Sequence, residues 1–446
     1  MLCLLCAAAV SAVATVFTNR PLQKMRVQRW QLILRGCVAI VVGLLSLAST
    51  AVDAQWTAAT ALPEGYADHS LSYCNGFLYN VGGTTRIGGD GDSSHVLFAR
   101  VGSNGTSGPW STATSLPEGV FQHTAVAANG FLYVMGGDHF NDTIADHYTN
   151  TVYYSKLDTN GTVGSWQITS PLPYAAIFAS AAVWDKFIYF IGGLYDATNG
   201  FKTNAVVSAM IETNGSLSAW VAQPPLPVPG GVYAHSSVAN GFLYVLGGVF
   251  PGGIASKHVF FSKINGNGTL AGWNETTQMP QALYTHATVI ARGRVYLTGG
   301  STGSSLVNTC YSAAVRGDGT LSAWSNESSL PQPLSEHAVA ASDSYIFLSG
   351  GINSGSVPQP GVYSLPLPSP PAVPTLTLQG SVSNRSYQLR LTSSTNTGFG
   401  IRASTNLTSW TNVGWGFTDT NGTWVFQDTN AAQFPRRFYR AYWPLP

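Results

Sequence analysis

Residues 123–137 read HTAVAANGFLYVMGG, and this stretch decides the fold. Residues 123–128 alternate between apolar and polar side chains, which predicts a half-buried β-strand, and the apolar run Phe131–Met135 predicts a strand buried on both faces. Asn129-Gly130 between them predicts a tight hairpin turn, because Asn and Gly tolerate positive φ. The Gly136-Gly137 pair then ends the second strand. The stretch is therefore a β-hairpin with one fully buried strand.

The hairpin recurs along the chain. Its Gly-Gly pair is found six times, at Gly82-Gly83, Gly136-Gly137, Gly192-Gly193, Gly247-Gly248, Gly299-Gly300 and Gly350-Gly351. A tryptophan recurs in step, at Trp56, Trp110, Trp166, Trp220, Trp273 and Trp324, and each is followed by Leu-Pro or Met-Pro. Six units in register indicate a repeat architecture.

Each unit reads as four short strands, labelled a to d. In the second unit, residues 152–157 (VYYSKL) follow the hairpin as strand c, and Asn160-Gly161 turns into strand d with Trp166. A unit of about 50 residues cannot bury both of its faces alone. Packing such units face to face around an axis buries them, so the sequence predicts an all-β fold with a β-propeller.

The spacing of FLYVMGG, Val-Tyr and Trp resembles the kelch repeat, including the central domain of galactose oxidase, and the resemblance covers residues 55–367. It implies a six-bladed kelch-type β-propeller. Kelch proteins close the ring by sharing one blade between the chain ends. Here the repeat region opens with a lone strand d at Trp56 and ends with a lone strand c at residues 362–365, so we expect these two segments to pair.

Residues 1–54 differ from the rest and are interpreted as a leader with a signal peptide. A basic start at Met25, an apolar run at residues 37–48 and small residues at 52–54 favour Met25 as the true start. A membrane segment at residues 1–17, or another explanation, stays open. We expect a secreted or cell-surface protein. After residue 54 no apolar run approaches 18 residues, so we expect no membrane span in the mature chain.

Seven prolines between residues 358 and 374 predict a stiff, extended segment, and residues 368–374 are assigned as a linker. Residues 375–446 alternate as the strands of a small β-sandwich. Residues 403–410 (ASTNLTSW) and 436–441 (RRFYRA) resemble a module that ends many secreted bacterial proteins. Attachment or sorting at the cell surface and a plain capping role are both open.

Composition excludes several classes of protein. Charged residues make up 9% of the 446-residue chain and aromatic residues 12%, which argues against a coiled coil and against a disordered chain. With 21 basic and 20 acidic residues the chain has no strong field for nucleic acid, so we expect no nucleic-acid partner. After the leader, Cys74 and Cys310 fall in non-adjacent units, so we expect two free, half-buried thiols.

The kelch resemblance implies that ligands bind where the d–a and b–c loops meet at one mouth of the central channel. Histidine stands at the predicted start of strand a in five units, at His69, His123, His235, His286 and His337, and Ala179 replaces it in the third. Such a ring could hold a metal or move protons. Alternatively, the histidines are structural, because a repeat copies its structural residues.

The residues just before these histidines differ between units, which favours a functional role for these positions. Ala234 and Thr285 are among them. Aromatic and polar side chains at a concave mouth suit a sugar or a peptide. The candidate ligand-binding residues are Tyr66, Asp68, Phe121, Gln122, Tyr174, Phe178, Tyr233, Tyr284 and Glu336. Asp68 and Glu336 should lie on adjacent blades, either as an acid–base pair or as two solvated rim acids.

Two loops concentrate acids and histidines, at residues 138–147 and, more weakly, 90–95. They could bind a divalent cation, but turns also favour Asp and Asn. We therefore expect no metal and no cofactor. Ten Asn-x-Ser/Thr sequons occur, among them Asn104, Asn160, Asn214 and Asn267, which are glycan acceptors or simply turn residues.

The leading hypothesis is a monomeric, non-catalytic recognition protein that binds a glycan or protein at the propeller mouth. The alternative is a carbohydrate-active enzyme such as a sialic-acid mutarotase-like isomerase; a purely structural or adhesive role is a third reading. Galactose oxidase activity is disfavoured, because neither Cys74 nor Cys310 is expected at the mouth. A sugar carboxylate calls for an arginine fork, and Arg86 is the only arginine in a mouth loop.

Overall fold

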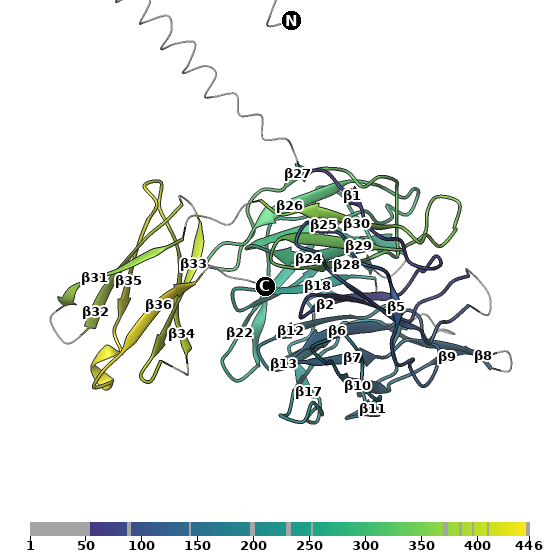
Figure 1. Ribbon diagram of the computed structural model, residues 1–446, viewed down its shortest axis with the longest axis horizontal. Helices are drawn as coiled ribbons and strands as arrows, with labels where there is room; N and C mark the ends of the chain where they lie inside the picture. Colours follow the sequence, from purple (N-terminus) through teal and green to yellow (C-terminus); the bar gives the residue numbers. More distant parts are fainter. Residues whose placement is uncertain are drawn as a thin grey trace, which may run out of the picture. The chain divides into compact units, whose positions relative to one another are not determined.

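The computed structural model describes residues 54–86, 91–141, 144–196, 201–228, 233–250, 253–368, 373–382, 386–394, 397–407 and 410–442 (Figure 1). The leader, including the expected start at Met25, lies outside these residues, as does most of the proline-rich linker. The described residues form β-strands and one 3-10 turn, η1 (Ala431–Gln433). No helix among them is long and apolar enough to cross a bilayer. The all-β prediction is confirmed.

The described residues contain six four-stranded antiparallel blades. The first three, each given from its innermost to its outermost strand, are β2 (Ser70–Cys74), β3 (Phe77–Val81), β4 (Val96–Arg100) and β5 (Ser111–Thr112); β6 (Thr124–Ala128), β7 (Phe131–Met135), β10 (Val152–Lys156) and β11 (Gln167–Ile168); and β12 (Ser180–Trp184), β13 (Phe187–Ile191), β16 (Val206–Met210) and β17 (Val221–Gln223).

The other three are β18 (His235–Ala239), β19 (Phe242–Leu246), β22 (Val259–Ile264) and β23 (Leu270–Glu275); β24 (Ala287–Ala291), β25 (Arg294–Thr298), β26 (Cys310–Ala314) and β27 (Ser325–Glu327); and β28 (Ala338–Ala341), β29 (Tyr345–Ser349), β30 (Val362–Pro366) and β1 (Thr57–Ala58). The six inner strands contact one another in a closed ring, since β2 touches both β6 and β28. The predicted six-bladed propeller is confirmed.

The sixth blade is completed by the beginning of the described chain. Thr57 of β1 lies opposite Ser364 of β30, and the Ala59 amide donates to the Val362 carbonyl at 2.8 Å. The predicted pairing is therefore present. It joins segments about 300 residues apart in a ring whose other contacts are between sequence neighbours.

The recurrent tryptophans tie each blade to the one before it. Every indole Nε1 donates to a backbone carbonyl that follows strand d of the preceding blade, as Trp110 does to Thr60 at 2.9 Å. The other five bonds are Trp56 to Ser328, Trp166 to Thr114, Trp220 to Ser170, Trp273 to Pro224 and Trp324 to Thr277. The repeat keeps tryptophan because it fills the gap between blades with apolar surface and satisfies a carbonyl.

The core lies between the blades. Tyr133 on β7 is fully buried, and its hydroxyl donates to the Gly215 carbonyl in the next blade at 2.8 Å. Gly215 has φ +88, and a Cβ there would lie 2.3 Å from the Phe131 ring, so the turn needs glycine. The adjacent Asn214 Oδ1 accepts from the Ser216 amide at 3.0 Å. This turn geometry explains the sequon at Asn214 without a glycan.

Three neighbouring blades carry an extra hairpin between strands b and c, on the side of the mouth. The hairpins are β8 (Asp138–Asn141) with β9 (Ile144–Tyr148), β14 (Leu194–Asp196) with β15 (Phe201–Lys202), and β20 (Val249–Phe250) with β21 (Ile254–Ala255). Figure 1 shows β8 and β9 reaching out past the strands of their blade. These additions make the mouth asymmetric, because the first, fifth and sixth blades have no such pair among the described residues.

The C-terminal module consists of two three-stranded sheets. One has the order β31 (Thr375–Val382), β32 (Ser386–Thr392) and β35 (Thr423–Asp428); the other has β34 (Thr411–Phe417), β33 (Gly398–Ser404) and β36 (Phe438–Tyr442). The sheets pack face to face, because a Cβ at Gly416 would lie 2.0 Å from the Trp424 ring. The domain boundaries at residues 54, 367 and 374 stay predictions.

The two described cysteines are unpaired, as expected. Cys310 is buried rather than half-buried, and burial raises the pKa of its thiol to about 12. A thiol held so firmly protonated is a packing group and not a nucleophile.

Candidate functional site

Six residues form a ring at one end of the channel, one from each blade just before its inner strand. They are Asp68, Gln122, Phe178, Tyr233, Thr285 and Glu336, and all have φ between 48° and 56°. Backbone hydrogen bonds run between neighbours in the ring: the Gln122 amide donates to the Asp68 carbonyl at 3.0 Å and the Phe178 amide to the Gln122 carbonyl at 2.9 Å. In the same way, the amides of Asp68, Tyr233 and Glu336 donate to the carbonyls of Glu336, Phe178 and Thr285, respectively. We call these six residues the mouth ring.

The mouth ring opens into a cavity of about 390 Å³ along the propeller axis. The inner strands line it with small side chains, such as Ser72, Ala127, Ala181 and Ser237. A volume in this range suits a small ligand group. All six ring residues are among the lining residues.

The structure corrects the register of the fourth blade. Its strand β18 begins at His235, whereas β2 begins at Ser70, one residue after His69. Tyr233 therefore occupies the mouth-ring position that the sequence analysis gave to Ala234, and Ala234 is the counterpart of His69. The signal was present in the sequence: His235 precedes its Gly-Gly pair by 12 residues, whereas His69 precedes its own by 13.

The remaining four histidines pack against the Gly-Gly pair of the preceding blade, and two of them, His69 and His337, also hydrogen-bond to that blade. His69 Nε2 hydrogen-bonds to Ser349 Oγ at 2.8 Å and His337 Nε2 to Thr298 Oγ1 at 2.9 Å, each partner being the last residue of strand b in the preceding blade. A Cβ at Gly82 would lie 2.8 Å from Cε1 of His123, so the Gly-Gly pair makes room for the ring. The structural reading of these histidines therefore fits the geometry.

Burial keeps these imidazoles neutral. His69, His123 and His337 are each less than 8% exposed, and burial lowers the pKa of each to about 3. The pKa of His286 is lowered by the same cause. They are therefore uncharged at neutral pH. No group of three or more potential metal ligands is found in the described part of the chain.

Asp68 and Glu336 lie on adjacent blades, where the ring closes. Burial raises the pKa of the Asp68 carboxyl well above its ordinary value, and the nearby Glu336 raises it further. Gln122 Nε2 donates to Asp68 Oδ2 at 3.3 Å, which opposes this shift. Burial also raises the pKa of Glu336, to about 7. The pair is thus held partly protonated near neutral pH, unlike two solvated rim acids.

Aromatic rings form another part of the mouth. The ring centres of Phe178 and Tyr233 are 3.9 Å apart, and Tyr284 meets Tyr233 edge-on at 5.8 Å. Burial raises the pKa of the Tyr233 phenol, and the charges of Asp68 and Glu336 raise it further. The mouth therefore combines an aromatic wall with two carboxyl groups, and the phenol of Tyr233 lies within their electrostatic reach.

Five of the nine candidate residues line the cavity: Asp68, Gln122, Phe178, Tyr233 and Glu336. Tyr284 does not line the cavity, but its ring meets that of Tyr233, which does. Phe121 pairs its backbone with Asp138, and Tyr174 packs edge-on against Phe190 in the core. Thr285, which the sequence analysis noted only as a varying position, belongs to the mouth ring.

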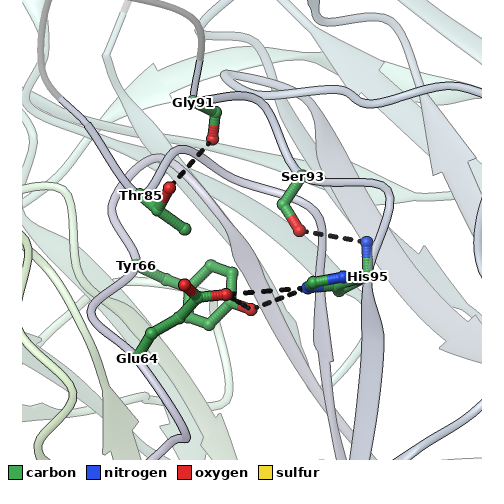
Figure 2. Close-up of polar contacts among 6 residues, drawn as sticks. All are labelled: Glu64, Tyr66, Thr85, Gly91, Ser93 and His95. Carbon is green, nitrogen blue, oxygen red and sulfur yellow. Dashed lines mark hydrogen bonds and ion pairs between the residues drawn. The ribbon is translucent and has the colours of Figure 1, made fainter.

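Tyr66 is 1% exposed and does not line the cavity. Figure 2 shows its hydroxyl between Glu64 and His95; it donates to Glu64 Oε1 at 2.7 Å and lies 3.1 Å from His95 Nδ1. In the same view Thr85 bonds the Gly91 carbonyl, and Ser93 Oγ accepts from the His95 amide. The contact between Tyr66 and His95 connects the d–a and b–c loops of the first blade, and the other contacts shape each loop.

The two loops considered for cation binding are described only in part. Asp90, Asp142 and the side chain of Asp146 lie outside the described residues. His139, which is described, is engaged with the Gly119 carbonyl and lies 3.6 Å from Glu118 Oε2. Arg86 is exposed and does not line the cavity, and neither does any other Lys or Arg of the described residues.

No protein-family model matches the chain. Among curated proteins, it is 23% identical over 350 residues to Kelch-like protein terF of Aspergillus terreus, which covers 74% of each chain. It is 25% identical over 227 residues to Kelch repeat and BTB domain-containing protein 1 of Ectromelia virus. That match covers 50% of this chain and spans only 36% of the relative's length.

A solved structure titled "Structure of YjhT" is similar to this chain with a TM-score of 0.56 and 15% sequence identity. The match covers 76% of this chain and 100% of the other. Similarity at this level of identity shows the fold. The curated matches are to kelch-repeat proteins, the solved structure shows the fold, and neither tests the C-terminal module.

Proposed function

We propose that this kelch-type β-propeller is a secreted or cell-surface recognition protein whose mouth ring binds a sugar residue of a glycan. The likeness to kelch-repeat proteins supports a binding role, and the leader motivates the location. The ligand group is neutral or amine-bearing, and no catalysis is required. A protein loop seated at the same mouth is the competing occupant.

The observation that carries the proposal is the backbone of the mouth ring. Non-glycine residues in the left-handed region cost about 1–2 kcal/mol each, and glycine would avoid that cost. Phe178, Tyr233 and Thr285 are bulky or β-branched, for which this conformation is unusual. Strain of this kind gathers at functional sites. Six non-glycine residues occupy this strained position and all line one cavity, which supports a role for the side chains themselves.

The chemistry of the lining indicates the class of ligand. Aromatic faces such as that of Phe178 suit the apolar face of a sugar ring, and carboxyl and amide groups suit its hydroxyls. Asp68 and Glu336 together favour a neutral or cationic group, because an anion would meet two acids without a cationic partner. A sialic-acid ligand is therefore disfavoured at this site.

A second candidate, an isomerase that interconverts the anomers of a neutral sugar, is favoured by one observation: the pKa of Glu336 is raised to about 7. Ionised Glu336 would take the proton of the anomeric hydroxyl while the bond from the anomeric carbon to the ring oxygen breaks. Protonated Asp68 would give its proton to that ring oxygen. Reclosure on the other face, with both transfers reversed, yields the second anomer.

The test is a binding screen of the mature chain against neutral, amine-bearing and acidic glycans and against peptides. We expect binding to neutral or amine-bearing glycans that Phe178→Ala weakens at least tenfold. A matched control is Ile168→Ala, which also shortens an apolar side chain but at an exposed position that does not line the cavity. Binding to peptides alone, or glycan binding unchanged in Phe178→Ala, contradicts the proposal. Exchange of sugar anomers followed by NMR tests the second candidate, which is wrong if the protein leaves the exchange rate unchanged.

A further inference from the structure

The outer face of one sheet of the C-terminal module carries an unusual set of side chains. In the sheet β34–β33–β36, Phe399 and Ile401 of β33 are fully buried and point into the module. Strand alternation therefore sends Gly400 and Arg402 to the other face. Cross-strand pairing places Trp415 and Tyr442 opposite Gly400 on that outer face.

Aromatic rings cover the centre of this face. The Tyr442 ring lies over Gly400, where a Cβ would be 2.4 Å from it, and meets Trp415 edge-on at 5.1 Å. The Tyr442 hydroxyl donates to Asn412 Oδ1 at 2.7 Å. Glycine at position 400 thus allows two large rings to lie against the sheet at a fixed angle.

Two guanidinium groups lie beside these rings. Arg402 and Arg440 are direct cross-strand partners. The Arg402 guanidinium is 4.3 Å from the centre of the Tyr442 ring, and its Nε donates to Asn412 Oδ1 at 3.0 Å. The Arg440 guanidinium is 4.2 Å from the centre of the Trp410 ring. Stacking on a ring uses the face of a guanidinium and leaves N–H groups in its plane for a ligand.

Within the described residues of the module, neither arginine is neutralised by an acid. Residues 375–446 contain six arginines, no lysine and two acids, Asp419 and Asp428. Asp428 is paired with Arg437 at 2.7 Å, and Asp419 accepts from the backbone amides of its own turn. Among the described residues no ion pair involves Arg402 or Arg440. Like charges directly opposite each other in a sheet are destabilising, which makes this pair costly unless an anion binds between them.

We propose that this outer face, formed by Trp410, Trp415, Tyr442, Arg402 and Arg440, binds an acidic polysaccharide whose sugars carry carboxylates. Such a polymer alternates apolar ring faces with single charges, and the face offers aromatic rings beside two preorganised guanidinium groups. Nucleic acid fits less well, because binding to it commonly rests on many phosphate contacts and the face has two cations. The proposal is independent of the mouth ring, which repels anions.

The experiment measures binding of the full mature chain to polygalacturonate, with neutral dextran as the uncharged comparison. We expect binding to polygalacturonate only, weakening with added salt, and at least tenfold weaker in the double variant Arg402→Gln with Arg440→Gln. The matched control is Arg390→Gln with Arg436→Gln, which removes two exposed arginines of the same module, of which Arg390 lies in the other sheet, on β32.

Arg440→Gln alone is the second variant, because Arg440 is exposed and its loss should leave the module folded; we expect at least threefold weaker binding, with an unchanged melting transition. Equal losses of affinity for polygalacturonate in the double variant and in the control would show that the net charge of the module causes the binding, and would overturn the proposal. So would tighter binding to single-stranded DNA or to phosphatidylglycerol vesicles than to polygalacturonate, or no binding to polygalacturonate at all.

Discussion

The Asp68 amide donates to the Glu336 carbonyl at 3.2 Å, across the seam where the sixth blade meets the first. The same two residues contribute the acidic side chains of the mouth. Closure of the ring by β1 and β30 therefore brings together two carboxyl groups that are 268 positions apart in the sequence. The geometry of the candidate site therefore depends on the closure of the ring at this seam.

Glu336→Gln should change the pH dependence of stability in a defined direction. The raised pKa of Glu336, about 7, means that the folded state keeps a proton that the unfolded state loses near pH 4.5. This group therefore reduces the free energy of unfolding as pH rises from about 4.5 to 7. In Glu336→Gln the melting temperature should fall less over this interval than in the wild type. A variant whose pH profile follows the wild type would show that Glu336 titrates normally.

His123→Ala should make the propeller less sensitive to acid. Its pKa of about 3 in the folded state lies below the ordinary value near 6.5, so the unfolded state binds the proton first as pH falls. Stability is lost progressively between about pH 6.5 and 3. Alanine already stands at the equivalent position in two blades, at Ala179 and Ala234, so the fold accepts it. Urea unfolding at pH 7 and at pH 4 measures the effect; the gap between the two midpoints should narrow.

Removal of residues 54–60 should destabilise the propeller far more than loss of one tryptophan bond. Trp324→Phe removes a single hydrogen bond to Thr277, worth about 1 kcal/mol. The truncation removes β1, the Trp56 bond to Ser328 and the closure of the ring. Urea midpoints of the two variants give the comparison. Similar midpoints would mean that the seam contributes no more than an ordinary contact between blades.

Arg437→Met should destabilise the C-terminal module by about 3–5 kcal/mol, because it leaves the charge of Asp428 buried without its partner. The two side chains are 8% and 5% exposed and 2.7 Å apart, and the Tyr439 hydroxyl also donates to Asp428, at 2.9 Å. Calorimetry of the full chain should show a shifted transition, whereas exposed Arg390→Gln should leave it in place. If Arg437→Met costs less than 1 kcal/mol, the pair is not buried as described.

The sequence was sufficient for the number of blades, the strand order within them and the seam at Trp56. One hydrophobic pattern occurs six times with the same turn residues, and such local patterns determine strands and hairpins. The sequence also placed Asp68 and Glu336 on adjacent blades. It aligned His235 with the other four histidines, although His235 lies one residue further along its blade, and a shift of one residue in a strand sends a side chain to the other face. It also assigned Tyr66 to the mouth, whereas this loop residue is buried away from the cavity.

Only the tertiary structure determines which side chains reach the axis of the propeller and whether the titratable groups there are protonated. The left-handed backbone of the mouth ring turns Phe178 and Tyr233 into the cavity, while Tyr66 is directed into the loop packing. Burial, which no local pattern reports, makes the inner histidines neutral and the mouth acids hard to ionise. Likewise, only pairing across β33 and β36 places Arg402 beside Arg440, since the two are far apart in sequence and meet through the register of the sheet.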